Sequence, residues 1–160
     1  MKFLKTIHFD PSDTRVFPLA AGSDEWAVSG GFSFSTFEED ELKGKWKQAF
    51  SNGFFSIESF GHATFTQVVS LEEAQVADLQ SMLAQHFVDR FGAPSVADAL
   101  PVAAAEIDFI VKLCTEVPIN SVFTLRRFFD DTGEIREEFR IIDTPGEKPH
   151  ARVWDVIEDE

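Results

Sequence analysis

Residues 126–140, RRFFDDTGEIREEFR, decide the fold because they join two strand-like segments through one turn. The flanking segments 122–129 and 134–142 are rich in aromatic and β-branched residues, as strands are. Between them, Asp130 to Gly133 has the residues of a type I turn, with Asp first and Gly fourth. Gly133 accepts the left-handed conformation that a three-residue hairpin loop needs. The sequence therefore predicts a β-hairpin.

The side chains select one register for this hairpin. A three-residue loop sorts apolar with apolar and Arg with Glu on each face. The expected pairs are Phe129–Ile135, Arg127–Glu137, Leu125–Phe139 and Phe123–Ile141 on one face, and Phe128–Arg136, Arg126–Glu138 and Thr124–Arg140 on the other. A one-residue shift sets Arg127 against Arg136 or Leu125 against Arg140. We interpret the charges as fixing the register, with a ligand-binding surface as the alternative.

Two helices are predicted in the middle of the chain, over residues 71–91 and 95–117. A capping box of Ser70 and Glu73 opens the first, and Gly92 follows its last apolar residue. Ser95 is placed to cap the second, in which Pro101 predicts a kink or a restart. A shorter helix is expected between a capping box at Thr36 and the pair Asn52-Gly53.

Strand patterns occur on both sides of these helices. The expected strands are 2–9, one beginning at 16–17, 26–34, 54–60, 62–69 and a short one within 153–160. We predict a single α+β domain over residues 1–160, mainly an antiparallel sheet, with the helices of about 71–91 and 95–117 packed on one face. The C-terminal end of the sequence, at about 155–160, is acidic.

Composition excludes several functions. With 28 acidic and 14 basic residues, the formal net charge is −14, which disfavours nucleic acid and anionic membranes as partners. There are 18 Phe and no Tyr, which favours core packing first and a partner or self-association interface second. The single cysteine, Cys114, and the lack of a signal peptide or an 18-residue apolar run predict a soluble cytoplasmic protein.

Few residues indicate chemistry. No His or Cys pair has metal-ligand spacing, so we predict no metal, no cofactor and no catalytic residue. His62 follows Gly61 near a strand start and is the best candidate to enter a cleft. His150 lies in a Pro- and Gly-containing loop. Arg126 and Arg136 are the other candidate ligand-binding residues. For each histidine, a structural role is the competing interpretation.

Four segments resemble a small family of uncharacterised bacterial proteins, a domain of unknown function. They are WAVSGGFSF (26–34), KQAFSNGFF (47–55), FGHATFTQV (60–68) and GEIREEFRII (133–142). The resemblance covers most of the chain and implies no established activity or catalytic residues.

Two hypotheses about function follow. The first is a non-catalytic cytoplasmic binding or accessory protein that acts through a protein partner or by self-association. The alternative is a small-molecule binder or small enzyme that uses His62 or His150 in a cleft, beside Arg126, Arg136 or Glu58. An exposed Phe patch favours the first hypothesis, and a pocket that contains one of these histidines favours the second.

Overall fold

The computed structural model describes residues 1–142 and 153–157 of the chain. Within them, eight strands form one sheet in the order β4-β3-β2-β1-β5-β6-β7-β8, and every strand pairing is antiparallel. The strands are β1 (Lys2–Ile7), β2 (Trp26–Val28), β3 (Phe54–Ser56), β4 (His62–Ala63), β5 (Phe65–Ser70), β6 (Val122–Phe129), β7 (Ile135–Ile142) and β8 (Val153–Ile157). The predicted α+β class is confirmed.

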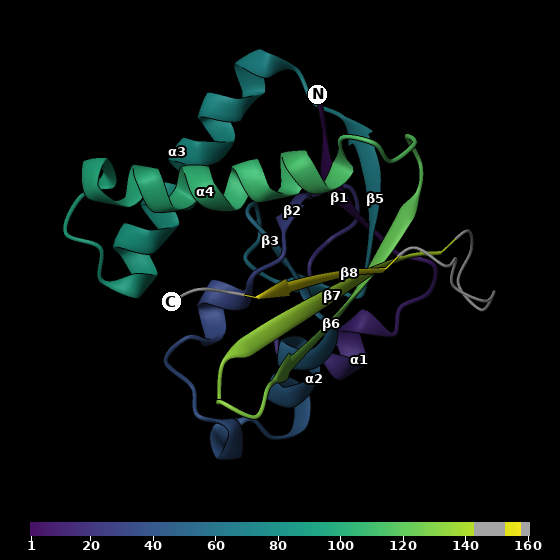
Figure 1. Ribbon diagram of the computed structural model, residues 1–160, viewed down its shortest axis with the longest axis vertical. Coiled ribbons are helices and arrows are strands. Elements are labelled where there is room, and N and C mark those ends of the chain that lie inside the picture. The colour runs from purple at the N-terminus through teal and green to yellow at the C-terminus, as the bar shows by residue number, and fades with distance from the viewer. Residues whose placement is uncertain (143–152, 158–160) are drawn as a thin grey trace.

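The helices divide into two groups (Figure 1). The long helices α3 (Glu73–Phe91) and α4 (Val96–Cys114) pack against each other above strands β6 to β8 in that view. The short helices α1 (Asp13–Val16) and α2 (Gly44–Asn52) lie below these strands. Two 3₁₀ turns, η1 (Gly31–Phe34) and η2 (Glu39–Glu41), precede α2.

The hairpin of β6 and β7 has the predicted register at every pair, from Phe129–Ile135 to Phe123–Ile141. In its turn, the N–H of Gly133 donates to the carbonyl of Asp130 at 3.0 Å, and Gly133 has φ of +84°. The sorted charges and apolar residues thus place the strands as the sequence indicates.

The sheet is curled. The rings of Phe54 on β3 and Phe139 on β7 have centroids 6.2 Å apart, although four strands lie between them in the sheet order. Such a contact requires the sheet to bend into an open half-barrel. Both ends of the described chain contribute strands, but β1 lies inside the sheet while β8 forms an edge.

Both long helices were predicted, with small differences at their ends. The capping box of α3 is made by Glu72 and Gln75, two residues beyond the expected Ser70, and Gly92 ends the helix at φ of +75°. The side chain of Ser95 accepts from the N–H of Asp98 at 3.1 Å and begins α4. Of the kink or restart predicted at Pro101, the restart is absent, because helix α4 runs through Pro101 as one element.

The largest errors of prediction fall between residues 11 and 43. Helix α1 occupies the place of the strand expected at 16–17. The strand expected over 26–34 ends at Val28, because Gly30 at φ of +91° turns the chain into η1. The capping box expected at Thr36 is instead formed by Glu38 and Glu41 around η2. Helix α2 begins at Gly44 and ends at the predicted Asn52-Gly53.

Two hydrophobic clusters fill the interior. The larger lies among the sheet and helices α3 and α4, and includes Phe3, Phe123 and Ile107. The smaller surrounds α2 and contains Phe17, Phe34, Leu42, Ala49, Phe50 and Ile135. Most of the Phe residues are therefore in the core or packed against it, which is their first predicted role.

One ion pair lies inside the core. Arg127 and Glu137 are each 1% exposed, and the Nε of Arg127 donates to Glu137 at 2.8 Å. The other guanidinium nitrogens donate to the carbonyls of Phe50 at 2.7 Å and Ser29 at 2.6 Å. Arg127 thereby joins β7, the C-terminal end of α2 and the segment after β2. Within the described residues, no helix is both long and apolar enough to cross a membrane.

Candidate functional site

The candidate arginines lie on the outer face of the β6–β7 hairpin. Arg126 donates to both carboxylate oxygens of Glu138, at 2.9 and 3.0 Å, and its guanidinium lies 4.3 Å from the ring centre of Phe128. Arg136 donates to Asp130 at 2.8 Å. These contacts hold the hairpin together, and neither arginine lines the pocket that contains His62.

The remaining candidates are His150, Glu58 and His62. His150 lies outside the described residues. Glu58 accepts a hydrogen bond from the backbone N–H of Trp26 at 2.6 Å and does not line the pocket. His62 does line this pocket, as expected from the sequence for one of the two candidate histidines.

The pocket at His62, which we call the His62 pocket, has a volume of about 360 Å³ and is open to solvent. Its walls come from the loop after α1, from η1 and the segment that follows it, and from α2, β3, β4 and the C-terminal end of α3. Aromatic side chains dominate. The lining residues are Leu19, Ser33, Phe37, Trp46, Phe55, Ser59, Phe60, His62, His86, Arg90 and Phe91.

The backbone of His62 is fixed on both sides. On one side His62 pairs with Phe55 across β3 and β4. On the other side its N–H donates to the carbonyl of Leu19 and its carbonyl accepts from Ala21, both at 2.9 Å. The preceding Gly61 makes this approach possible, because a Cβ there would lie 2.6 Å from the carbonyl carbon of Ala20.

The ring of His62 is 5% exposed and is surrounded by Phe17, Phe34 and Phe55, with centroids 5.8 to 5.9 Å away. Burial, and then the positive charge of Arg127, lower the pKa of His62 from 6.5 to about 4. The imidazole is therefore neutral near pH 7 and offers one N–H donor and one acceptor. Neither ring nitrogen has a hydrogen-bond partner among the described residues.

A second imidazole forms one wall of the pocket. His86 on α3 stacks on Phe60, with centroids 4.0 Å apart and planes 13° from parallel. Phe60 has φ of +64°, which a bulky aromatic residue rarely adopts. Burial, and then Arg90, lower the pKa of His86. The strained backbone at Phe60 thus presents its ring to α3 at the edge of the pocket.

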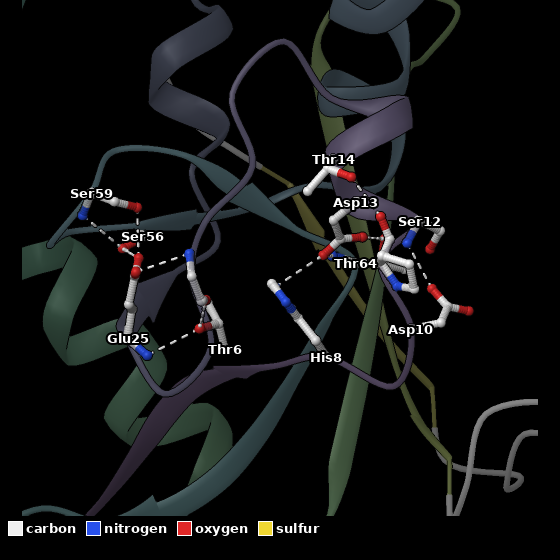
Figure 2. Close-up of polar contacts among 12 residues, drawn as sticks. Thr6, His8, Asp10, Ser12, Asp13, Thr14, Glu25, Ser56, Ser59 and Thr64 are labelled. Atoms are coloured by element: carbon white, nitrogen blue, oxygen red, sulfur yellow. Dashed lines mark hydrogen bonds and ion pairs between the residues drawn. The ribbon is translucent and has the colours of Figure 1, made fainter.

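Figure 2 shows a polar network around Ser56 and Ser59. These residues belong to the segment between β3 and β4 that also contains Phe60. The carboxylate of Glu25 accepts from the hydroxyls of Ser56 at 2.7 Å and Ser59 at 2.6 Å. The hydroxyl oxygen of Ser56 in turn accepts from the N–H groups of Glu58 and Ser59, each at 3.1 Å. Through these hydrogen bonds, Glu25 fixes the turn between β3 and β4.

A second network in Figure 2 combines His8, Asp13 and Thr64. The hydroxyl of Thr64 donates to buried Asp13 at 2.6 Å, and the Nε2 of His8 lies 3.5 Å from the same carboxylate. A nucleophilic triad needs the imidazole between hydroxyl and carboxylate. Here the carboxylate is in the middle, so the arrangement ties α1 to the residue after β4 and does not activate a nucleophile.

Arg90 gives the pocket its charge. It is the one charged side chain among the described residues that line the pocket, with both histidines neutral. It is exposed in the last turn of α3, and among the described residues it has no hydrogen bond or ion pair. Its neighbour Asp89 accepts from the side chain of Gln85 at 2.9 Å.

Other parts of the molecule offer less chemistry. A larger hollow of about 490 Å³ adjoins Lys2 and Ile119, but the amine of Lys2 donates to the carbonyl of Val117 at 2.8 Å. Burial raises the pKa of the Cys114 thiol to about 12, which outweighs the opposing effect of Lys2. No group of three or more metal-ligating side chains occurs among the described residues.

Comparison with known proteins gives one result. A model described as a family of unknown function matches residues 1–152. No curated protein and no solved structure matches the chain.

Proposed function

The chain belongs to DUF6505, a family of unknown function, and we propose that this protein is a non-catalytic binding protein that holds a small molecule in the His62 pocket. The observation that carries the proposal is His62 itself. It is a neutral imidazole, 5% exposed, with both nitrogens unpartnered among the described residues, and it lines an open aromatic pocket. Buried polar groups normally have partners, so this one is an unused recognition element.

The energetic argument concerns the two ring nitrogens. Leaving a buried donor or acceptor unsatisfied costs about 1–3 kcal/mol. A ligand group that reaches one of these nitrogens recovers part of this free energy on binding. The rings of Trp46 and Phe60 add apolar contact area at the mouth. A few placed polar groups on apolar walls are the usual composition of a ligand pocket.

The same residues support binding over catalysis. The lowered pKa leaves His62 a weak base near pH 7. None of the described residues that line the pocket is a carboxylate, and burial lowers the pKa of the second imidazole there, His86, so that it too is a weakened base. The cytoplasm is the setting we propose, because the chain has a single cysteine and that thiol is buried.

The test is a fragment screen by ligand-observed NMR, with the site mapped by amide chemical shifts. We expect binders whose affinity falls at least tenfold in His62→Leu, which keeps the apolar volume and removes both nitrogens. His8→Asn, outside the pocket, is the control and should bind as the wild type does. Fragments that bind elsewhere, or equally well to His62→Leu, contradict the proposal.

A second candidate function is self-association through the mouth of the same pocket. Leu19, Trp46, Phe60 and Phe91 line the pocket and are each between 39% and 54% exposed. Exposed apolar groups that cluster favour a protein interface. Sedimentation velocity at micromolar concentration should then show an oligomer that Trp46→Ser dissociates, while Val102→Ser, exposed on α4, does not. A monomer throughout contradicts this candidate.

A further inference from the structure

We propose that the ligand of the His62 pocket is an aromatic monocarboxylate, with its carboxylate on Arg90 and its ring against the aromatic wall. The inference rests on the proposed function and specifies the ligand class. It combines three features of one hollow, which are the charge of Arg90, the flat aromatic lining and the unpartnered nitrogens of His62.

The charge of the pocket selects an anion. Arg90 is a partner-free guanidinium among the described residues, in a protein of net charge −14. A guanidinium binds a carboxylate through two parallel hydrogen bonds, which matches its planar fork. An anion at this position therefore meets the cationic group that the described residues bring to the pocket.

The groups around Arg90 limit how much negative charge the ligand can carry. Arg90 lies in the last turn of α3, where the helix dipole places partial negative charge. The adjacent Asp89 adds a carboxylate beside it. A single guanidinium in this setting offsets one negative charge, which favours a carboxylate over a phosphate or a dicarboxylate.

The shape of the pocket selects a flat apolar body. Phe37, Trp46, Phe55, Phe60 and Phe91 form most of the wall. Aromatic side chains prefer offset or edge-to-face contact with another ring. A volume of about 360 Å³ is at the small end for ligand pockets and suits a body of one or two rings.

His62 also favours a polar group on the aromatic ring of the ligand. Its neutral imidazole donates at one nitrogen and accepts at the other. A hydroxyl or ring N–H on the ligand can satisfy one of these groups. We therefore expect hydroxylated or heteroaromatic acids to bind more tightly than unsubstituted ones.

The experiment compares acids with their neutral isosteres by calorimetry and NMR. The probes are benzoate, 4-hydroxybenzoate and indole-3-carboxylate, each beside its primary amide. We expect at least one acid to bind in the pocket, its amide to bind at least tenfold more weakly, and Arg90→Gln to remove that difference. Arg90→Lys should keep part of it, because a point charge remains without the fork. Arg15→Gln, an exposed arginine on α1, should have no effect.

The outcomes separate the two proposals. If acid and amide bind equally and both depend on His62, the anion inference is overturned while the binding function stands. If none of the probes or screened fragments shifts the amides of the pocket, both are overturned. Urea unfolding of Arg90→Gln checks that its fold is intact, and we expect a midpoint equal to that of the wild type because the side chain is exposed.

Discussion

His62 combines two properties that are individually costly, a lowered pKa and two nitrogens that find no hydrogen-bond partner in the described part of the chain. Its folded pKa of about 4 lies below the unfolded value of 6.5. As the pH falls below 6.5, the unfolded chain takes up the proton first, so stability is lost between pH 6.5 and 4 and is fully present above that window. Folding therefore favours the neutral form of the His62 imidazole over the protonated form.

We predict that His62→Leu reduces the pH dependence of folding. Between pH 7.5 and 5, the wild type should lose about 2 kcal/mol more unfolding free energy than the variant does. Urea titrations at both pH values measure this difference. Phe17→Leu, which changes a neighbouring ring and keeps the imidazole, is the control. Equal pH dependence of the wild type and His62→Leu contradicts the assigned pKa.

Gly61 provides a second prediction at this scale. In Gly61→Ala the new Cβ meets backbone atoms of Ala20 and Ala21 within 2.7 Å, so the strand carrying His62 must shift. We expect a loss of about 1–3 kcal/mol in stability together with weaker ligand binding. Gly133→Ala has open space but φ of +84°, and it should cost about 1–2 kcal/mol without changing affinity. Calorimetry on both variants separates the two effects, and unchanged affinity in Gly61→Ala argues against a positioning role.

Single residues of the site were only partly predictable from the sequence. The pair Gly61-His62 is a local signal, because a glycine before a histidine at a strand start indicates close backbone approach. His86 and Arg90 carry no such signal. On an isolated helix they are ordinary polar positions, and only the docking of α3 against the turn at Phe60 brings them to the pocket.

At the scale of elements, the buried pair Arg127–Glu137 connects the hairpin with α2. Removing one partner of a buried ion pair costs about 3–5 kcal/mol, because the other charge stays buried. Arg127 also donates to the carbonyls of Phe50 and Ser29, which lose their donor with it. The pair therefore ties three elements together in addition to fixing the strand register.

We predict a marked non-additivity between Arg127→Met and Glu137→Leu. Each single variant should lose about 3–5 kcal/mol of unfolding free energy, and the double variant should lose less than the sum of the two. The double variant should still be less stable than the wild type, since the two carbonyls remain without a donor. Equilibrium unfolding of the four proteins gives the coupling free energy. A value near zero means that the pair does not interact in the folded protein.

The elements also show why prediction succeeded in one region and failed in another. The register of β6 and β7 followed from cross-strand pairs, which are determined locally by a short turn. The sequence even placed Arg127 and Glu137 on the same face as Leu125 and Phe139, which is the buried face. Between residues 11 and 43, by contrast, only the first part of the strand expected over 26–34 forms. The part after Gly30 is η1, where Phe34 packs against Phe50 and His62, and such tertiary packing is not visible in a local pattern.

At the scale of the whole molecule, the His62 pocket lies where the two hydrophobic clusters meet. Phe37, packed against the smaller cluster, and Trp46 line one side of the pocket. Phe55, a member of the larger cluster, and Phe91, which contacts Phe32 beside that cluster, line the other. This arrangement depends on the curl of the sheet, which no strand pattern in the sequence reveals.

The unequal size of the clusters gives the last prediction. Counting only residues that the structure describes, the larger contains 24 buried residues and the smaller contains six, so the part around α2 is the less stable. We expect amides of α2 to exchange with solvent through a partial opening, at a lower free energy than amides of α3 and α4, which should exchange through global unfolding. Phe34→Leu should speed exchange in all three helices, because Phe34 belongs to the smaller cluster, which is lost both in the partial opening and in global unfolding. Ile107→Val, in the larger cluster, should instead speed exchange in α3 and α4 and leave α2 unchanged, because the larger cluster stays intact in the partial opening. Native-state hydrogen exchange followed by mass spectrometry measures both variants, and equal protection across all three helices means that the molecule unfolds as one cooperative unit.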